Sequence, residues 1–224
     1  MDGTGELFQP FLAAAKNEFS AIVIRYPTDR LLDYAALTAL VSSQFPTNER
    51  FVLLAESFSG PIAVTLAASK PKGLSGLVLC ATFARNPRPK LGCLIPLFSL
   101  LPLSWVPARV ISYFFLGRFA TTELRDDLKR VLGNVDRSVI SKRLRSIIEV
   151  NVTNELQQID VPLLYLMASE DRLVTSNTAI PFERLRNCRI TKITGPHLLM
   201  QSVPREVAIA LRTFLNRCDE TRRM

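Results

Sequence analysis

One stretch of the sequence decides the fold: residues 51–61 read Phe-Val-Leu-Leu-Ala-Glu-Ser-Phe-Ser-Gly-Pro. The uncharged apolar residues 51–54 are typical of a buried β-strand, and the apolar run 62–68 predicts the helix that follows. A strand that turns directly into a helix passes through a sharp corner, where large side chains would collide. Small residues, Ala55 and Ser59, lie two positions either side of Ser57. We therefore expect Ser57 at the corner, with its hydroxyl presented at the carboxyl end of a sheet.

A serine at such a corner has two interpretations. Ser57 could simply cap the helix, which is an ordinary role of serine. A catalytic serine instead needs a base whose pKa lies near neutral pH, and histidine supplies one without perturbation. His197 is the only histidine of the chain and follows the predicted strand 188–193. A lone histidine is more often a structural or surface residue, so its position after a strand matters.

An acidic residue follows another predicted strand. The apolar run 161–168 ends just before Glu170 and Asp171. We expect Asp171 to orient the imidazole of His197 and to stabilise its charged form, whereas Glu170, the competing acid, has a solvated loop charge as its ordinary interpretation. Ser57, Asp171 and His197 each lie just past a predicted strand, so a parallel sheet would bring them to one edge.

This order and spacing resemble those of the α/β-hydrolases over nearly the whole chain. Ala55 and Ser59 replace the two glycines of the G-x-S-x-G nucleophile elbow, and the order Ser, Asp, His is the one found in that fold. Residues 1–8, Met-Asp-Gly-Thr-Gly-Glu-Leu-Phe, and residues 195–201, Gly-Pro-His-Leu-Leu-Met-Gln, resemble segments of a bacterial esterase-like subgroup. The elbow predicts that the N–H of Phe58 binds an oxyanion, and the resemblance implies Met1 as the second donor.

The predicted fold class is α/β, with a mostly parallel sheet flanked by helices. Apolar runs predict five strands that alternate with helical segments, at residues 21–24, 51–54, 76–79, 163–167 and 189–193. In the resembled family a further strand precedes the oxyanion loop and lies between the first two of these. We therefore expect Met1 to be an internal methionine, preceded in frame by about 4–8 apolar residues ending in Pro-Gly or His-Gly. A short variant whose sheet closes up is the alternative.

A long insertion separates two parts of the predicted core, residues 1–84 and 159–224. Residues 85–158 exceed a normal connection and predict a helical cap over the active site. Residues 91–108 carry no charge, but three prolines interrupt them, so no transmembrane span is expected. The cap is predicted to roof an acyl pocket, with ordinary core packing as the alternative. The proposed pocket side chains are Leu94, Phe98, Trp105 and Phe114.

Composition favours one enzyme domain. The chain has 224 residues, of which 48% are hydrophobic, enough to bury a core. Its polar start lacks the pattern of a signal peptide, so a cytoplasmic location is expected, although export stays open if the N-terminus is truncated. No metal motif or phosphate-binding loop is present, and we expect no cofactor and no metal. The cysteines, expected as free buried thiols, are Cys80, Cys93, Cys188 and Cys218.

The net charge of +8 indicates affinity for anionic partners. The basic residues are mixed with acidic and apolar ones, without an aromatic-basic module, which argues against nucleic acid. The positive charge fits an ester or thioester substrate, including one linked to a carrier protein or to coenzyme A. It also fits an anionic membrane surface or a plain solvated surface. The second half of the cap is amphipathic and basic, and Arg118, Arg130 and Arg143 are among its basic residues.

These features together predict a serine hydrolase that cleaves a carboxylic ester or thioester through an acyl-enzyme. An acyltransferase would use the same three residues and differ only in its acceptor. The alternative from another class is a binding protein with a hydrolase-like fold and no catalytic activity. The absent oxyanion strand makes this alternative stronger here than it would be for a chain with that strand.

Overall fold

The computed structural model describes residues 2–16, 18–89 and 107–220. Its sheet contains four parallel strands among these residues, in the spatial order β1-β2-β3-β4. The strands are β1 (Phe51–Glu56), β2 (Leu74–Cys80), β3 (Leu163–Ala168) and β4 (Cys188–Ile193). Helical segments connect consecutive strands, as parallel pairing requires. The predicted α/β class is therefore confirmed.

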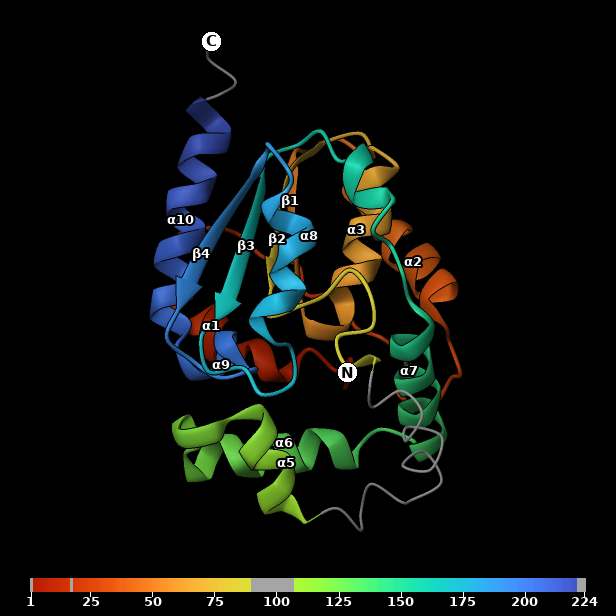
Figure 1. Ribbon diagram of the computed structural model, residues 1–224, viewed down its shortest axis with the longest axis vertical. Coiled ribbons are helices and arrows are strands. Elements are labelled where there is room, and N and C mark those ends of the chain that lie inside the picture. The colour runs from red at the N-terminus through yellow and green to blue at the C-terminus, as the bar shows by residue number, and fades with distance from the viewer. Residues whose placement is uncertain (1, 17, 90–106, 221–224) are drawn as a thin grey trace.

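Helices cover both faces of the sheet (Figure 1). One face carries α1 (Gln9–Ala14), α9 (Leu199–Ser202) and α10 (Pro204–Glu220), and the other carries α3 (Gly60–Ala68) and α8 (Ile180–Glu183), with α2 (Tyr34–Ser42) packed against α3. Along β2, Val78 and Cys80 enter the core on the α10 side, whereas Leu77 and Leu79 enter the core on the α3 side. This alternation explains why the strand is apolar at consecutive positions.

Three further helices lie beyond the carboxyl ends of the strands: α5 (Ala108–Phe115), α6 (Thr122–Gly133) and α7 (Arg137–Glu149). In Figure 1 the arrowheads of β3 and β4 point toward α5 and α6. Leu116, at the end of α5, and Leu128 of α6 pack against Leu198, which follows His197, so α5 and α6 contact the predicted site. Short 3-10 turns are η1 (Glu6–Phe8), η2 (Ser57–Ser59), η5 (Gly117–Phe119), η6 (Glu155–Gln158) and η7 (Ser176–Ala179). No helix within the described ranges combines the length and hydropathy of a membrane span.

The inserted segment ends earlier than residue 158. Arg85 and Asn151 form an antiparallel bridge that brings the two ends of the insertion together. Val152 and Leu156 are buried in the same cluster as Leu77 and Tyr165 of the sheet. The core therefore resumes near residue 152, because these apolar side chains fill the space beside α3.

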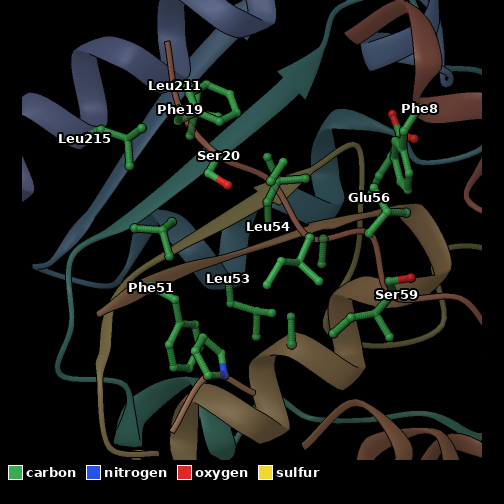
Figure 2. Close-up of a pocket in the computed structure, with 18 of the residues that line it drawn as sticks. Phe8, Phe19, Ser20, Phe51, Leu53, Leu54, Glu56, Ser59, Leu211 and Leu215 are labelled. Carbon is green, nitrogen blue, oxygen red and sulfur yellow. The ribbon is translucent and has the colours of Figure 1, made fainter. Parts of the chain in front are cut away.

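The prediction of a strand at residues 21–24 is also wrong. These residues form no strand, and the side chain of Ile22 is 73% exposed. Between residues 18–26 and β1 lies a cavity of about 620 Å³, seen in Figure 2 with Phe19 and Ser20 on one side and residues of β1 on the other. A strand needs a hydrogen-bonded neighbour, and the cavity occupies the place where the sequence analysis put the additional strand. Residues 21–24 consequently have no strand beside them with which to pair.

Candidate active site

Ser57 lies where β1 meets α3, at the corner that the sequence predicts. Its φ of 54° falls in the left-handed region, which residues other than glycine rarely adopt. β1 ends at Glu56, and the turn η2 leads directly into α3. The backbone at Ser57 is therefore strained, and its neighbours must hold it in this conformation.

Thr82 is one of these neighbours and was not foreseen from the sequence. Its fully buried hydroxyl donates to the carbonyl oxygen of Ser57, and the hydroxyl of Tyr165 donates to the Thr82 carbonyl at 2.6 Å. A Cβ atom on Gly60 would lie 1.9 Å from Thr82 Oγ1, so only glycine allows this approach. The signal that could have identified Thr82 is its position two residues after the end of β2, close to where Ser57 follows β1.

Two tyrosines support the other side of the corner. Tyr34 donates from its hydroxyl to the carbonyl of Phe58 at 3.1 Å, and its ring stacks on the Phe58 ring with centroids 4.7 Å apart. Tyr26 donates to Ser59 Oγ at 3.0 Å. Burial raises the pKa of both phenols, so they act as neutral donors. The backbone that carries the expected oxyanion donor, Phe58 N–H, is thereby fixed.

The structure brings Ser57, His197 and Asp171 together. Ser57 Oγ lies 2.7 Å from His197 Nε2, and His197 Nδ1 lies 2.8 Å from Asp171 Oδ2. The His197 and Asp171 side chains are each 2% exposed. The second carboxylate oxygen of Asp171 accepts hydrogen bonds from the N–H groups of Leu173 and Val174 at 2.7 and 2.8 Å. Both oxygens of Asp171 are therefore held, and one of them faces the imidazole.

Glu170, the competing acid, faces the other way. Its carboxylate forms a bidentate interaction with Arg118, with nitrogen-oxygen distances of 2.7 and 2.9 Å. Arg118 lowers the pKa of Glu170, and the pair lies at the surface. Glu170 is therefore a surface charge, as its ordinary interpretation predicted, and it forms an ion pair with Arg118.

The inserted helices contact the histidine through Phe115. The Phe115 ring stands edge-on to the imidazole with centroids 5.5 Å apart, and its carbonyl accepts from Leu198 N at 3.0 Å. Phe114, the predicted pocket residue on this helix, is instead 40% exposed and packs on Tyr113. Consecutive helical residues point about 100° apart, and the sequence could not choose between them. Three other predicted pocket residues, together with Met1, lie outside the described residues: Leu94, Phe98 and Trp105.

The N-terminal loop is anchored from α7. Gly3 and Gly5 have φ values of 77° and 75°, and the Gly3 carbonyl accepts from Tyr26 N at 2.8 Å. Arg143, one of the basic residues of the predicted cap, is 1% exposed and donates to the carbonyls of Asp2 and Pro27, each at 2.8 Å. Its charge therefore holds the loop rather than facing solvent.

Within the described residues, no three His, Cys, Asp or Glu side chains converge as metal ligands. Cys80 and Cys218 are buried as predicted, whereas Cys188 is half-buried, and Cys93 lies outside the described residues. On the inserted helices, Arg130 pairs with Glu6 and Asp127, so part of the basic surface is already neutralised.

Comparison with known proteins gives one family match. The family model described as serine aminopeptidase, S33, matches residues 23–194. Comparison with curated proteins found no match. An esterase from Exiguobacterium antarcticum is similar in structure, with a TM-score of 0.84 and 12% identity over 96% of this chain and 88% of that chain.

Two further solved structures are similar. A thermophilic esterase from Thermogutta terrifontis has a TM-score of 0.80 and 16% identity over 96% of this chain and 86% of that chain. An enol-lactonase from Burkholderia xenovorans LB400 has a TM-score of 0.78 and 14% identity over 96% of this chain and 88% of that chain. At these identities the likeness shows a shared fold.

Gly60→Ala should strain the corner, because the added methyl group would overlap the Thr82 side chain. We expect a loss of roughly 1–3 kcal/mol in the free energy of unfolding, measured by urea denaturation. Gly133→Ala is the control, since a Cβ atom there meets nothing within 4 Å at the end of α6. It should be neutral or stabilising by up to about 1 kcal/mol. Equal effects of the two substitutions would contradict the packing argument.

Proposed function

Because the chain belongs to the serine aminopeptidase S33 family of α/β-hydrolases, we propose that it is a serine hydrolase that cleaves a carboxylic ester or thioester. One observation carries this proposal. A serine held at φ 54° has its hydroxyl 2.7 Å from the imidazole of His197, whose other nitrogen lies 2.8 Å from a buried carboxylate. Such a chain of contacts activates a hydroxyl group as a nucleophile.

In the acylation step, Ser57 Oγ attacks the carbonyl carbon while His197 Nε2 takes the hydroxyl proton. Asp171 Oδ2 accepts the Nδ1–H of the imidazole, fixes its tautomer and stabilises the imidazolium. His197 then returns the proton to the leaving alcohol or thiol as the carbon-oxygen or carbon-sulfur bond breaks. The acyl group stays on Ser57.

Water completes the reaction in the deacylation step. His197 takes a proton from the water, the resulting hydroxide attacks the acyl carbon, and the proton passes to Ser57 Oγ as the acid leaves. In both steps negative charge develops on the carbonyl oxygen. The N–H of Phe58, whose carbonyl is held by Tyr34, is the proposed donor to that oxygen.

The ester or thioester specificity rests on the surroundings of His197. The inserted helices place Phe115, Leu116 and Leu128 against the histidine loop, and these apolar side chains suit an acyl chain. Similar structures are described as esterases from Exiguobacterium and Thermogutta and as an enol-lactonase from Burkholderia. A lactone is a cyclic ester, so all three descriptions name cleavage of the same bond type.

A fluorophosphonate probe tests whether Ser57 is a nucleophile. We expect stoichiometric labelling at Ser57, located by peptide mass spectrometry, because the contact with His197 activates the hydroxyl. Ser57→Ala provides the control and should show no labelling. Folded wild-type protein that does not react would instead support the non-catalytic binding protein.

Asp171 and Glu170 form a matched pair for testing the acid. Asp171→Ala should lower kcat by roughly 10⁴-fold on a p-nitrophenyl ester, because the imidazole loses its orienting carboxylate. Glu170→Ala removes only an exposed pair with Arg118 and should keep kcat within about twofold. The reverse pattern would make Glu170 the acid.

Phe115 and Phe114 form a matched pair for testing substrate choice. Phe115→Ala should change the preference between short and long acyl chains by about tenfold, because it removes the ring beside His197. Phe114→Ala should leave that preference unchanged, since this side chain faces solvent. The measurement is kcat/KM over a chain-length series of p-nitrophenyl esters. Identical profiles for the two variants would show that Phe115 does not line the acyl site.

A further inference from the structure

Glu56 is a buried acid next to Ser57, and the proposed mechanism does not use it. It is the last residue of β1, directly before Ser57, and is 8% exposed. Its side chain lies on the α10 side of the sheet, where its strand partner is Cys80. The described part of the chain contains no ion pair to Glu56. An acid buried this deeply is costly unless its surroundings stabilise it.

All the contacts of this carboxyl group are donors. Glu56 Oε1 accepts from the N–H of Met200 at 3.3 Å, and Oε2 accepts from Gln201 Nε2 at 2.9 Å. The Cys80 thiol is 3.9 Å from Oε1 and also donates. Burial raises the pKa of Glu56, while the bonds from Gln201 and Met200 and the charge of His197 act against this rise. With the Gln201 amide in this orientation, the described residues offer Glu56 three donors and no acceptor, which fits the ionised carboxylate.

Two of these donors belong to the turn that carries the histidine. Met200 and Gln201 lie in α9, which begins two residues after His197. Glu56 therefore connects the strand of the nucleophile with the turn of the base. The distance between Ser57 Oγ and His197 Nε2 depends on how these two segments are held together.

We propose that Glu56 is a positioning residue of the active site. Its carboxylate fixes the turn after His197 against β1, and it stabilises the positive charge that His197 gains when it takes the serine proton. This inference rests on the proposed function. It gives the histidine a second carboxylate besides Asp171, one that acts through space and through α9 rather than by direct contact.

Other titratable groups of the described residues face Glu56 or line the cavity beside it. Cys80 is the titratable group that faces Glu56 from β2, and burial raises its pKa well above the usual value, so it stays neutral. Glu56 lies toward one end of the cavity beside β1 and Phe51 toward the other (Figure 2). Glu49 and Arg50, which also line the cavity, precede Phe51 and thus lie roughly 20–23 Å from Glu56 along the extended chain. Arg212, a further lining residue, pairs with Glu18.

Replacing the Glu56 carboxylate with an amide tests the two proposed effects separately, namely the fixing of the turn and the negative charge. Gln201 Oε1 is buried and has no hydrogen-bond partner in the structure. In Glu56→Gln the new amide can still accept from Met200 N–H, and the Gln201 amide can rotate so that its oxygen accepts from the new NH₂ group. This substitution therefore keeps the link to α9 and removes the charge. Glu56→Ala removes both.

The test uses the single histidine as a reporter. With only one histidine in the chain, NMR of labelled imidazole follows the titration of His197 alone. In Glu56→Gln the titration midpoint should move to lower pH by about half a unit or more, because a nearby negative charge is lost. The rate of fluorophosphonate labelling at Ser57 should fall by about threefold to tenfold. Glu56→Ala should lower this rate further and also lower Tm.

The outcomes separate this inference from the proposed function. If wild-type Ser57 reacts with the probe but Glu56→Gln leaves both the midpoint and the labelling rate unchanged, the Glu56 inference is overturned and the hydrolase proposal stands. If wild-type protein is not labelled, the hydrolase proposal fails, and the inference that rests on it fails too.

A second variant covers the case in which Glu56→Gln does not fold. Gln201→Met removes the Nε2 donor, weakens the stabilisation of the carboxylate and should shift the midpoint and the rate in the same direction by smaller amounts. If both measurements match those of the wild type in that variant, the inference is overturned.

Discussion

The left-handed backbone of Ser57 is the constraint on which the rest of the site depends. A strained corner persists only when its surroundings determine it more strongly than its own preference does. Thr82 holds the carbonyl of Ser57 from β2, and Tyr34 holds the next carbonyl from α2. The close approach of Thr82 requires glycine at position 60. Neighbouring elements of the core thus meet at one residue, and the hydroxyl position follows from their packing.

Parallel pairing explains why residues from distant parts of the chain converge on this corner. The carboxyl ends of β1, β2 and β3 lie at one edge of the sheet, and they lead into Ser57, Thr82 and the segment with Asp171. The loop after β4 adds His197. The inserted helices lie beyond the same edge and contact the histidine through Phe115. The sheet provides the alignment of the polar groups, and the insertion provides an apolar surface beside them.

The sequence could predict those parts of the fold that depend on local pattern. The α/β class follows from apolar runs that alternate with helical segments, and the positions of Ser57, Asp171 and His197 follow from the ends of such runs. Residues 21–24 show the limit of this reasoning, because an apolar run forms a strand only beside a neighbour. Phe114 and Phe115 show another limit, since adjacent helical positions look alike until the helix is docked. Thr82, Tyr34 and Glu56 were missed because a polar residue near an apolar run gives no sign of its partner.

The position of β1 in the sheet has a consequence for how the protein loses activity. Among the strands of the described residues, β1 pairs only with β2, and its other side borders the cavity of about 620 Å³. Elements with fewer neighbours open at a lower free energy than the interior of a domain. We therefore expect local unfolding to begin at β1, the strand that leads into Ser57. We expect the backbone amides of residues 51–56 to exchange their hydrogens sooner than those of β2 and β3, and mild heating to break the contact between Ser57 and His197 before the helices melt.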